Sequence, residues 1–141
     1  MPTKDAYKNK LGYYLWLNAK QRAKVSNSEF LLTESYVNNL IETVQECPIL
    51  HEPFTIGSNK YGPSLDKKDS RNGYTDDNTW IVSKLANTMK SNSLPSERIL
   101  FALWVLKSHP KTLLKRKKDV IPVLEDVLEF LRKDDAESTK A

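Results

Sequence analysis

Residues 63–90 read PSLDKKDSRNGYTDDNTWIVSKLANTMK, and this stretch decides the fold that we predict. The apolar Leu65, the Gly73-Tyr74 turn and the β-prone residues 79–83 indicate two short strands joined by a turn. Gly73 is expected to supply a positive φ in this turn. A helical pattern over 84–91 follows directly. Because an isolated two-stranded ribbon is marginally stable in water, this helix is expected to pack against it. The stretch therefore predicts a β-turn-β-helix unit.

Helical patterns precede this unit. Apolar residues at turn spacing over 5–24 predict one helix, and Thr33 has the side chain of an N-cap for a second helix through about Gln45. The segment from Cys47 to Ser64 is rich in Pro, Gly, Ser and Asn, which favours hairpin and loop. The N-terminal part is thus expected to be helical.

Two further helices are predicted after the central unit. Residues 97–108 are so apolar that we expect this helix to be buried over most of its circumference, with Phe101 and Trp104 in the core. Asp119 and Pro122 suit the first turn of a last helix. Its apolar face would hold Ile121, Leu124, Leu128 and Leu131.

The chain of 141 residues is expected to form one domain. Within 1–141 we expect a helical part over 1–46, the central core over 47–93, C-terminal helices over 94–133 and a disordered tail over 134–141. The fold class is therefore α+β and mostly helical, with a hairpin and helix at the centre.

Bulk composition restricts the class of protein. No apolar run approaches the roughly 20 residues of a membrane-spanning helix, and the first ten residues lack the apolar stretch of a signal peptide, so we expect a cytoplasmic protein. One cysteine, Cys47, excludes a disulfide within the chain and a multi-cysteine zinc knuckle, so no structural zinc is expected. We expect Cys47 to be a small buried apolar residue.

Charge is distributed unevenly although the net charge is only +4. Residues 1–25 hold six Lys or Arg and one Asp, residues 26–52 hold five Glu and no Lys or Arg, and residues 107–118 hold six Lys or Arg and no acid. Two basic segments around an acidic one favour a polyanionic partner. A solvated lysine-rich surface is the alternative interpretation.

Two oxygen-bearing side chains of the central unit, Asp66 and Asn87, could form a metal site. Asp66 lies near the end of the first strand, Asn78 opens the second, and Asn87 lies in the helix. A carboxylate and an amide oxygen that meet at one point suit Mg²⁺, which keeps several waters and accepts phosphate oxygens. Lys67 and Lys90 flank these ligands and could add positive charge at a phosphate. The structural alternatives are that Asp66 caps a turn and that Asn87 bonds to the hairpin backbone.

The stretch from 63 to 93 resembles the signature of small phage-type HNH endonucleases with the ββα-metal fold. That pattern runs Pro-Ser-Leu-Asp-Arg-x-Asp, then Gly-Tyr, then Asn, and then Ala-Asn-x-x-Lys-Ser in the helix. The segments AKQRAKVSNSEFLLT and CPIL also resemble that family, so the likeness covers roughly residues 10–98. The resemblance implies a ββα-metal core flanked by helices, in a bacteriophage-type protein.

Position by position, the resemblance implies that Asp66 and Asn87 hold Mg²⁺ or Mn²⁺ and that Asn78 pins the turn. Lys67 stands where typical HNH enzymes have their base histidine and where this branch often has arginine. A lysine with the ordinary pKa of roughly 10.4 is protonated at neutral pH and cannot accept a proton from water. Lys67 could instead stabilise charge on the phosphate, and the base would then be His51, or Tyr61 on the same preceding loop.

The resemblance also implies DNA as the partner, contacted on the minor-groove side. Binding through phosphates should weaken steeply with salt. No recognition helix or zinc finger is visible, so the target sequence cannot be read. The expected phosphate contacts are Lys20, Arg22, Lys24, Lys68, Arg71, Lys84, Lys115, Arg116, Lys117 and Lys118.

Three functional hypotheses follow. The first is a metal-dependent HNH-type DNA endonuclease or nickase. The second is an inactive HNH scaffold, phage-derived, that binds nucleic acid or a host protein, for which the acidic segment with Glu29, Glu34, Glu42 and Glu46 would be a contact surface. The third is a helical structural protein with an accidental resemblance. A homodimer is compatible with each, and no membrane partner is expected.

Overall fold

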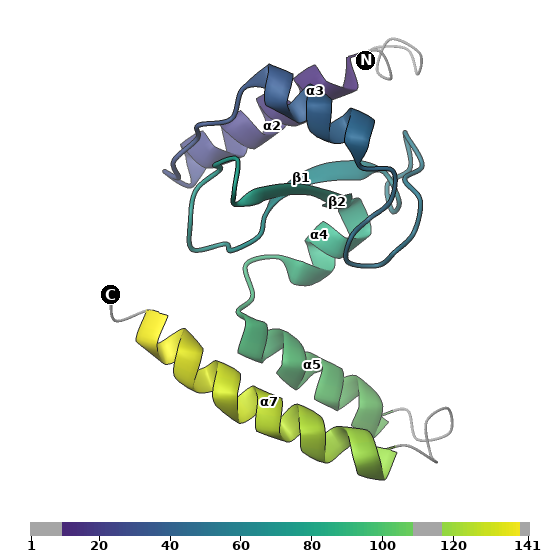
Figure 1. Ribbon diagram of the computed structural model, residues 1–141, viewed down its shortest axis with the longest axis vertical. Coiled ribbons are helices and arrows are strands. Elements are labelled where there is room, and N and C mark those ends of the chain that lie inside the picture. Colours follow the sequence, from purple (N-terminus) through teal and green to yellow (C-terminus); the bar gives the residue numbers. More distant parts are fainter. Residues whose placement is uncertain (1–9, 109–116, 139–141) are drawn as a thin grey trace. The chain divides into compact units, whose positions relative to one another are not determined.

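The computed structural model describes residues 10–108 and 117–138. Within them the fold is α+β and mostly helical, as predicted, with five helices and one two-stranded antiparallel sheet (Figure 1). No helix in the described ranges is long and apolar enough to cross a membrane. The elements are α2 (Leu11–Val25), α3 (Glu34–Thr43), β1 (Pro63–Lys67), β2 (Thr79–Ser83), α4 (Lys84–Lys90), α5 (Pro95–Ser108) and α7 (Lys117–Ser138).

The contacts divide the chain into two compact units, residues 1–91 and 92–141. The first unit contains α2, α3, the hairpin and α4. The second contains α5 and α7. The expectation of one domain over 1–141 stays a prediction, and the two units are described separately.

Side-chain caps begin two helices of the first unit. Thr33 Oγ1 accepts a hydrogen bond from the Tyr36 N–H at 3.1 Å, which confirms the predicted N-cap of α3. Ser83 Oγ accepts one from the Ala86 N–H at 3.1 Å and starts α4 directly at the end of β2. The sheet and α4 are therefore joined without a loop, which fixes the direction in which α4 leaves the hairpin.

Strand alternation gives the hairpin two different faces. Leu65 pairs with Ile81, and Asp66 pairs with Trp80 in the antiparallel register. Because successive side chains point to opposite faces, Leu65 and Ile81 share one face and Asp66 and Trp80 share the other. Figure 1 shows α2 and α3 over one face of the hairpin and α4 over the other. The hairpin is thus the middle layer of the first unit.

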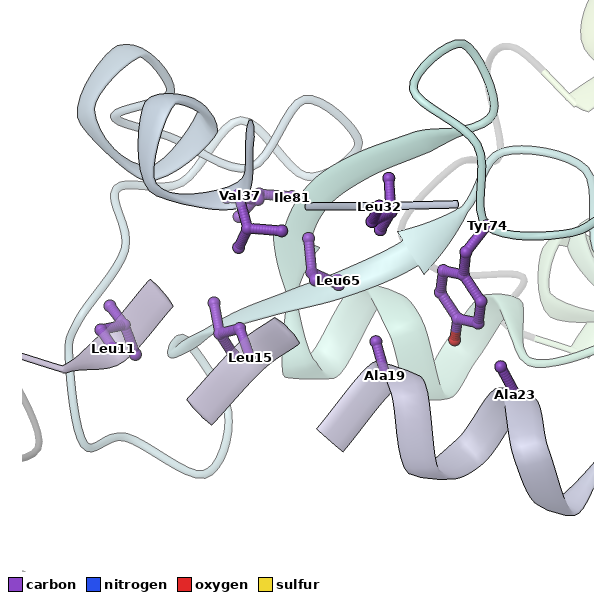
Figure 2. Close-up of a cluster of buried hydrophobic side chains, with 9 residues drawn as sticks. All are labelled: Leu11, Leu15, Ala19, Ala23, Leu32, Val37, Leu65, Tyr74 and Ile81. Carbon is purple, nitrogen blue, oxygen red and sulfur yellow. The ribbon is translucent and has the colours of Figure 1, made fainter. Parts of the chain in front are cut away.

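The main core lies between the hairpin and the two N-terminal helices (Figure 2). Ala19 and Ala23 let α2 approach closely, and the ring of Tyr74 reaches in from the β1–β2 turn. A second cluster on the α4 side contains Cys47, Val82 and Ala86, so Cys47 is a small buried residue as expected. The full set in Figure 2 is Leu11, Leu15, Ala19, Ala23, Leu32, Val37, Leu65, Tyr74 and Ile81.

The Trp80 side chain is partly buried and packs against the second cluster. Gly73 lies in the β1–β2 turn where a close approach between two segments requires it. A Cβ on Gly73 would lie 2.6 Å from the Glu29 Cβ and 2.7 Å from the Glu29 carbonyl oxygen. Tyr74 N donates to that same carbonyl at 2.8 Å, so the turn is joined to the 29–31 segment. The turn therefore requires glycine at position 73 because there is no room for a side chain. Gly73 does not have the positive φ that we expected.

In the second unit α5 and α7 lie side by side and run antiparallel, because the start of α5 contacts the end of α7. The predicted apolar face of α7 is confirmed: Leu128 is buried, and Ile121, Leu124 and Leu131 are partly buried. The expectation that α5 is buried over most of its circumference is wrong. Phe101 and Trp104 are 61% and 57% exposed. Among the described residues of this unit α5 packs against one helix, α7, and one helix covers one side only.

The bounds of α7 correct two further expectations. The helix begins at Lys117, so Pro122 is its sixth residue and lies beyond the first turn. The helix also continues through Ser138, so 134–138 is helical where a disordered tail was expected. The buried Asp135 carboxylate accepts hydrogen bonds from Ser96 N at 3.2 Å and Ser96 Oγ at 2.5 Å. This cap at the start of α5 gives the last turns of α7 a partner.

Candidate functional site

The candidate site lies between β1 and α4. Ser64 and Asp66 share one face of β1, and Asn87 and Lys90, three positions apart, share one face of α4. These two faces contact each other. Asn87 Nδ2 donates to Ser64 Oγ at 3.0 Å, and Lys90 Nζ lies 3.1 Å from Asp66 Oδ2. The structure thus places Asp66 and Asn87, the two predicted metal ligands, at neighbouring positions of one strand–helix contact.

The Asp66 carboxylate is already neutralised from within the protein. The side chains of Lys90 and Asp66 are 6% and 9% exposed, and Trp80 Nε1 donates to the same Asp66 Oδ2 at 3.0 Å. Lys90 Nζ also donates to the Lys67 carbonyl oxygen at 2.6 Å. The ammonium that we expected at a substrate phosphate is therefore buried and bonded to β1. The Asp66–Trp80 contact follows from the strand register.

A divalent cation fits the donor set on one condition. The nitrogen of the Asn87 amide contacts Ser64, which leaves the amide oxygen as the atom able to bind a cation. No cluster of three His, Cys, Asp or Glu side chains able to hold a metal occurs within 10–108 or 117–138. One carboxylate and one amide oxygen suit Mg²⁺ completed by water and phosphate oxygens. The condition is that Lys90 moves away from Asp66.

Lys67 lies on the other face of the hairpin. Alternation along β1 points its side chain away from the Asp66 face. Its Nζ lies 5.4 Å from the centroid of the Tyr74 ring and donates to the Ser70 carbonyl at 3.4 Å. The structure therefore brings Lys90, and not Lys67, to the Asp66 carboxylate. Only the backbone carbonyl of Lys67 takes part in that contact.

Asn78 holds the β1–β2 turn as predicted. Its Oδ1 accepts from the Asp69 N–H at 2.9 Å, and its Nδ2 donates to the carbonyls of Asp69 at 3.1 Å and Gly73 at 2.8 Å. Its backbone carbonyl accepts from the Lys68 N–H at 2.7 Å. One side chain thus joins both sides of the turn immediately beyond the strand that carries Asp66.

Asp69 is a further organising residue of the turn that the sequence analysis did not single out. Arg71 Nε and NH2 each donate to its carboxylate at 2.9 Å, and so does the Arg71 N–H. The hydrogen bonds from the Arg71 side chain hold the pKa of Asp69 below its ordinary value, although partial burial raises that pKa. Arg71 is therefore paired within the turn, which reduces the charge that it can offer to a phosphate.

The candidate bases lie on the preceding loop. The His51 side chain is exposed, its backbone has a φ of 56°, and its Nδ1 is 4.0 Å from Glu46 Oε1. Its backbone N–H donates to the Cys47 carbonyl at 2.8 Å. The ring of Tyr61 lies 5.3 Å from Lys60 Nζ. No hydrogen bond or ion pair among the described residues links His51 to β1 or α4.

The predicted phosphate contacts fall into different environments. Arg22 NH2 donates to the Leu65 carbonyl at 3.1 Å and thereby braces β1 against α2, and Lys20 Nζ lies 4.8 Å from the Trp16 ring centroid. Lys24 and Lys68 are exposed, and Lys84 is half-buried. Arg22 thus has a structural contact that spacing along the chain did not indicate.

The second basic segment is only partly described. Lys118 is exposed on α7. Lys115, Arg116 and the side chain of Lys117 lie outside the described residues. Comparison of the chain with protein-family models, with curated proteins and with solved structures gives no match.

Proposed function

We propose that this chain is a metal-dependent nuclease that cleaves phosphodiester bonds of DNA, as an HNH-type endonuclease or nickase. The observation that carries the proposal is the placement of Asp66 on β1 and Asn87 on α4 at one contact between strand and helix. The hairpin-plus-helix arrangement and the resemblance of residues 63–93 to the HNH signature support it. A phage origin and a cytoplasmic location belong to the same proposal.

In this proposal Asp66 and Asn87 hold Mg²⁺ or Mn²⁺. Such a cation, when bound, stabilises the negative charge that develops on a phosphodiester during cleavage. Asn78 keeps the end of β1 in place through its three side-chain hydrogen bonds. His51 is the candidate base, because its imidazole is exposed and therefore open to a substrate-bound water.

Lys90 has a second role in the proposal. Its ammonium neutralises Asp66 while no cation is bound, so a buried carboxylate is not left without a counter-charge. Once Lys90 leaves the carboxylate, its charge becomes available to phosphate oxygens. The exposed Lys24 and Lys68 contribute contacts to the DNA backbone that weaken with added salt.

The proposal is tested by plasmid cleavage with Mg²⁺ or Mn²⁺. We expect the wild type to nick or cut, and Asp66→Ala and Asn87→Ala to lose activity by a factor of at least about 100. Matched controls are Asp134→Ala and Asn39→Ala, which alter exposed residues of the same types. DNA binding should be similar in all five proteins. A wild type that binds DNA but never cuts with either metal contradicts the nuclease proposal.

The ion pair itself favours a second candidate function, a non-catalytic nucleic-acid-binding or host-protein-binding module. On this hypothesis Lys90 and Asp66 form a permanent structural pair. DNA binding would then be insensitive to EDTA, and electron paramagnetic resonance would detect no Mn²⁺ bound to the wild type. The nuclease proposal expects bound Mn²⁺ that Asp66→Asn abolishes. If the chain binds a protein but not DNA, the candidate contact surface is the acidic segment with Glu29, Glu34, Glu42 and Glu46.

A further inference from the structure

Helix α7 carries two parallel rows of apolar residues. The inner row faces α5. Each residue of the outer row comes immediately before a residue of the inner row in the sequence. The side chains of the outer row are 39%, 59%, 38% and 70% exposed, in chain order. Both rows have the 3-4-3 spacing of heptad a and d positions. The inner row is Ile121, Leu124, Leu128 and Leu131, and the outer row is Val120, Val123, Val127 and Phe130.

The outer row lies about 100° around the helix from the inner row, because one residue of an α-helix turns through that angle. A helix that packs on the inner row therefore cannot also cover the outer row. Four neighbouring apolar side chains along one helix form a contiguous patch of the kind that marks an interaction site. Single exposed residues such as Val25 on α2 need no such explanation.

We propose that the outer row is a homodimer interface, in which α7 packs antiparallel against α7 of a second copy of this chain. The 3-4-3 spacing reads the same in both directions. A two-fold axis near Glu125 therefore places Val120 opposite Phe130 of the second copy and Val123 opposite Val127 of the second copy. Large side chains then lie opposite small ones at both ends, as close packing requires.

Charges beside the outer row agree with this occupant. Asp119 and Lys133 are two heptads apart, so they flank the row on the same side. Antiparallel pairing brings Asp119 opposite Lys133 of the second copy, at both ends of the interface. Lys133 Nζ is 3.7 Å from Glu129 in an exposed i,i+4 pair, which restrains it little. The outer row and its flanking charges are therefore complementary to the same surface of a second copy, in both apolar spacing and charge.

The same register predicts an unfavourable contact at the centre. Asp126 occupies the heptad position midway between Asp119 and Lys133, so it approaches its own counterpart beside the two-fold axis. Like charges there weaken the pairing. This gives the proposal a signature that a parallel dimer would not share, because in a parallel coiled coil Asp126 would face a different heptad position of the second copy.

The first experiment is sedimentation velocity over a concentration series of the full chain. We expect a dimer that the double substitution Val123→Glu with Val127→Glu converts to monomer, with the helical circular dichroism retained. Val25→Glu is the matched control, because it places the same charge on an apolar residue that is 90% exposed on α2, and it should leave the dimer intact. A monomeric wild type throughout the series overturns the proposal.

The second experiment tests the register with charge changes that leave the apolar row intact. Asp119→Lys and Lys133→Asp should each weaken the dimer about three- to tenfold, and their combination should restore it. Asp126→Asn should tighten it. No recovery in the charge swap overturns the antiparallel register. A dimer that resists the α7 changes but is lost in Trp104→Glu places the interface on α5 and overturns the assignment to α7.

Discussion

The β1–β2–α4 region and the α5–α7 pair differ in the residue types that they bury and expose. In the first, a lysine and an aspartate are buried between strand and helix. In the second, phenylalanine, tryptophan and valine side chains are exposed. The hairpin is covered on both faces, whereas each helix of the pair is covered on one side by the other. The number of packed layers, more than residue polarity, decides what is buried.

The polar interior of the first region is possible because each charged group has partners. Lys90 Nζ has the Asp66 carboxylate and the Lys67 carbonyl, and Asp66 also has Trp80 Nε1. The second region also buries a carboxylate, Asp135, whose Oδ2 accepts hydrogen bonds from Ser96 at the start of α5. The comparison leads to four predictions, given from the largest expected effect to the smallest.

The largest effect is expected from Lys90→Ala. This change leaves the buried Asp66 carboxylate without its counter-ion, and breaking a buried pair from one side costs about 3–5 kcal/mol. The free energy of unfolding from urea denaturation measures the loss. Lys68→Ala, an exposed lysine in the adjacent turn, should change that energy by less than about 0.5 kcal/mol. Equal effects of the two substitutions would show that burial does not distinguish them.

Asn78→Ala should destabilise the turn beyond β1. The substitution removes three side-chain hydrogen bonds to backbone groups of Asp69 and Gly73, at a cost of about 2–4 kcal/mol. Hydrogen exchange should show faster exchange of the Asp69 and Lys68 amides. Asn72→Ala, an exposed asparagine of the same turn, is the control and should leave these rates unchanged.

Asp135→Ala should act on the second region. It leaves the N–H and hydroxyl of Ser96 without their acceptor, which costs about 1–3 kcal/mol. Amide exchange should accelerate in the first turn of α5 while the β1–β2 ladder keeps its protection. The neighbouring exposed residue provides the control Asp134→Ala. Equal acceleration in the hairpin would contradict the separation of the two units.

The smallest effect is expected from Arg71→Ala. Without the Arg71 hydrogen bonds the pKa of Asp69 should rise toward its ordinary value, measured by NMR titration of the carboxyl. A depressed folded-state pKa contributes stability that is present above the unfolded pKa of 3.8 and is lost as the pH falls through the folded value. The variant should therefore lose less stability than the wild type on acidification. Arg132→Ala, an exposed arginine of α7, should leave the Asp69 titration unchanged.

Much of the fold and part of the site could be predicted from spacing along the chain. The Thr33 cap, the hairpin over 63–83 and the inner row of α7 were all visible in the sequence, and the resemblance to the HNH signature implied the pinning role of Asn78. Each depends on partners that are close in the chain or on one helical or strand period. The contact between Asp66 and Trp80 could also have been predicted, because it follows from the antiparallel register once the position of the turn is known.

Other expectations were wrong because they depended on what packs from a distance. Gly73 has no side chain because the 29–31 segment, more than 40 residues earlier in the chain, approaches it. Phe101 and Trp104 are exposed because, within 92–108 and 117–138, α5 has one helix beside it. The 134–138 segment is helical, and its buried Asp135 bonds to Ser96, which precedes it by 39 residues.

The sequence by itself determined the local elements: where helices start and which strand positions share a face. Those features follow from backbone geometry and short-range hydrogen bonds, which depend on residues close together in the chain. Only the tertiary structure decided that Lys90 neutralises Asp66, that Lys67 lies on the other face, and that one row of α7 remains exposed. Burial and ion pairing depend on which surfaces the other elements cover, and a linear pattern does not contain that information.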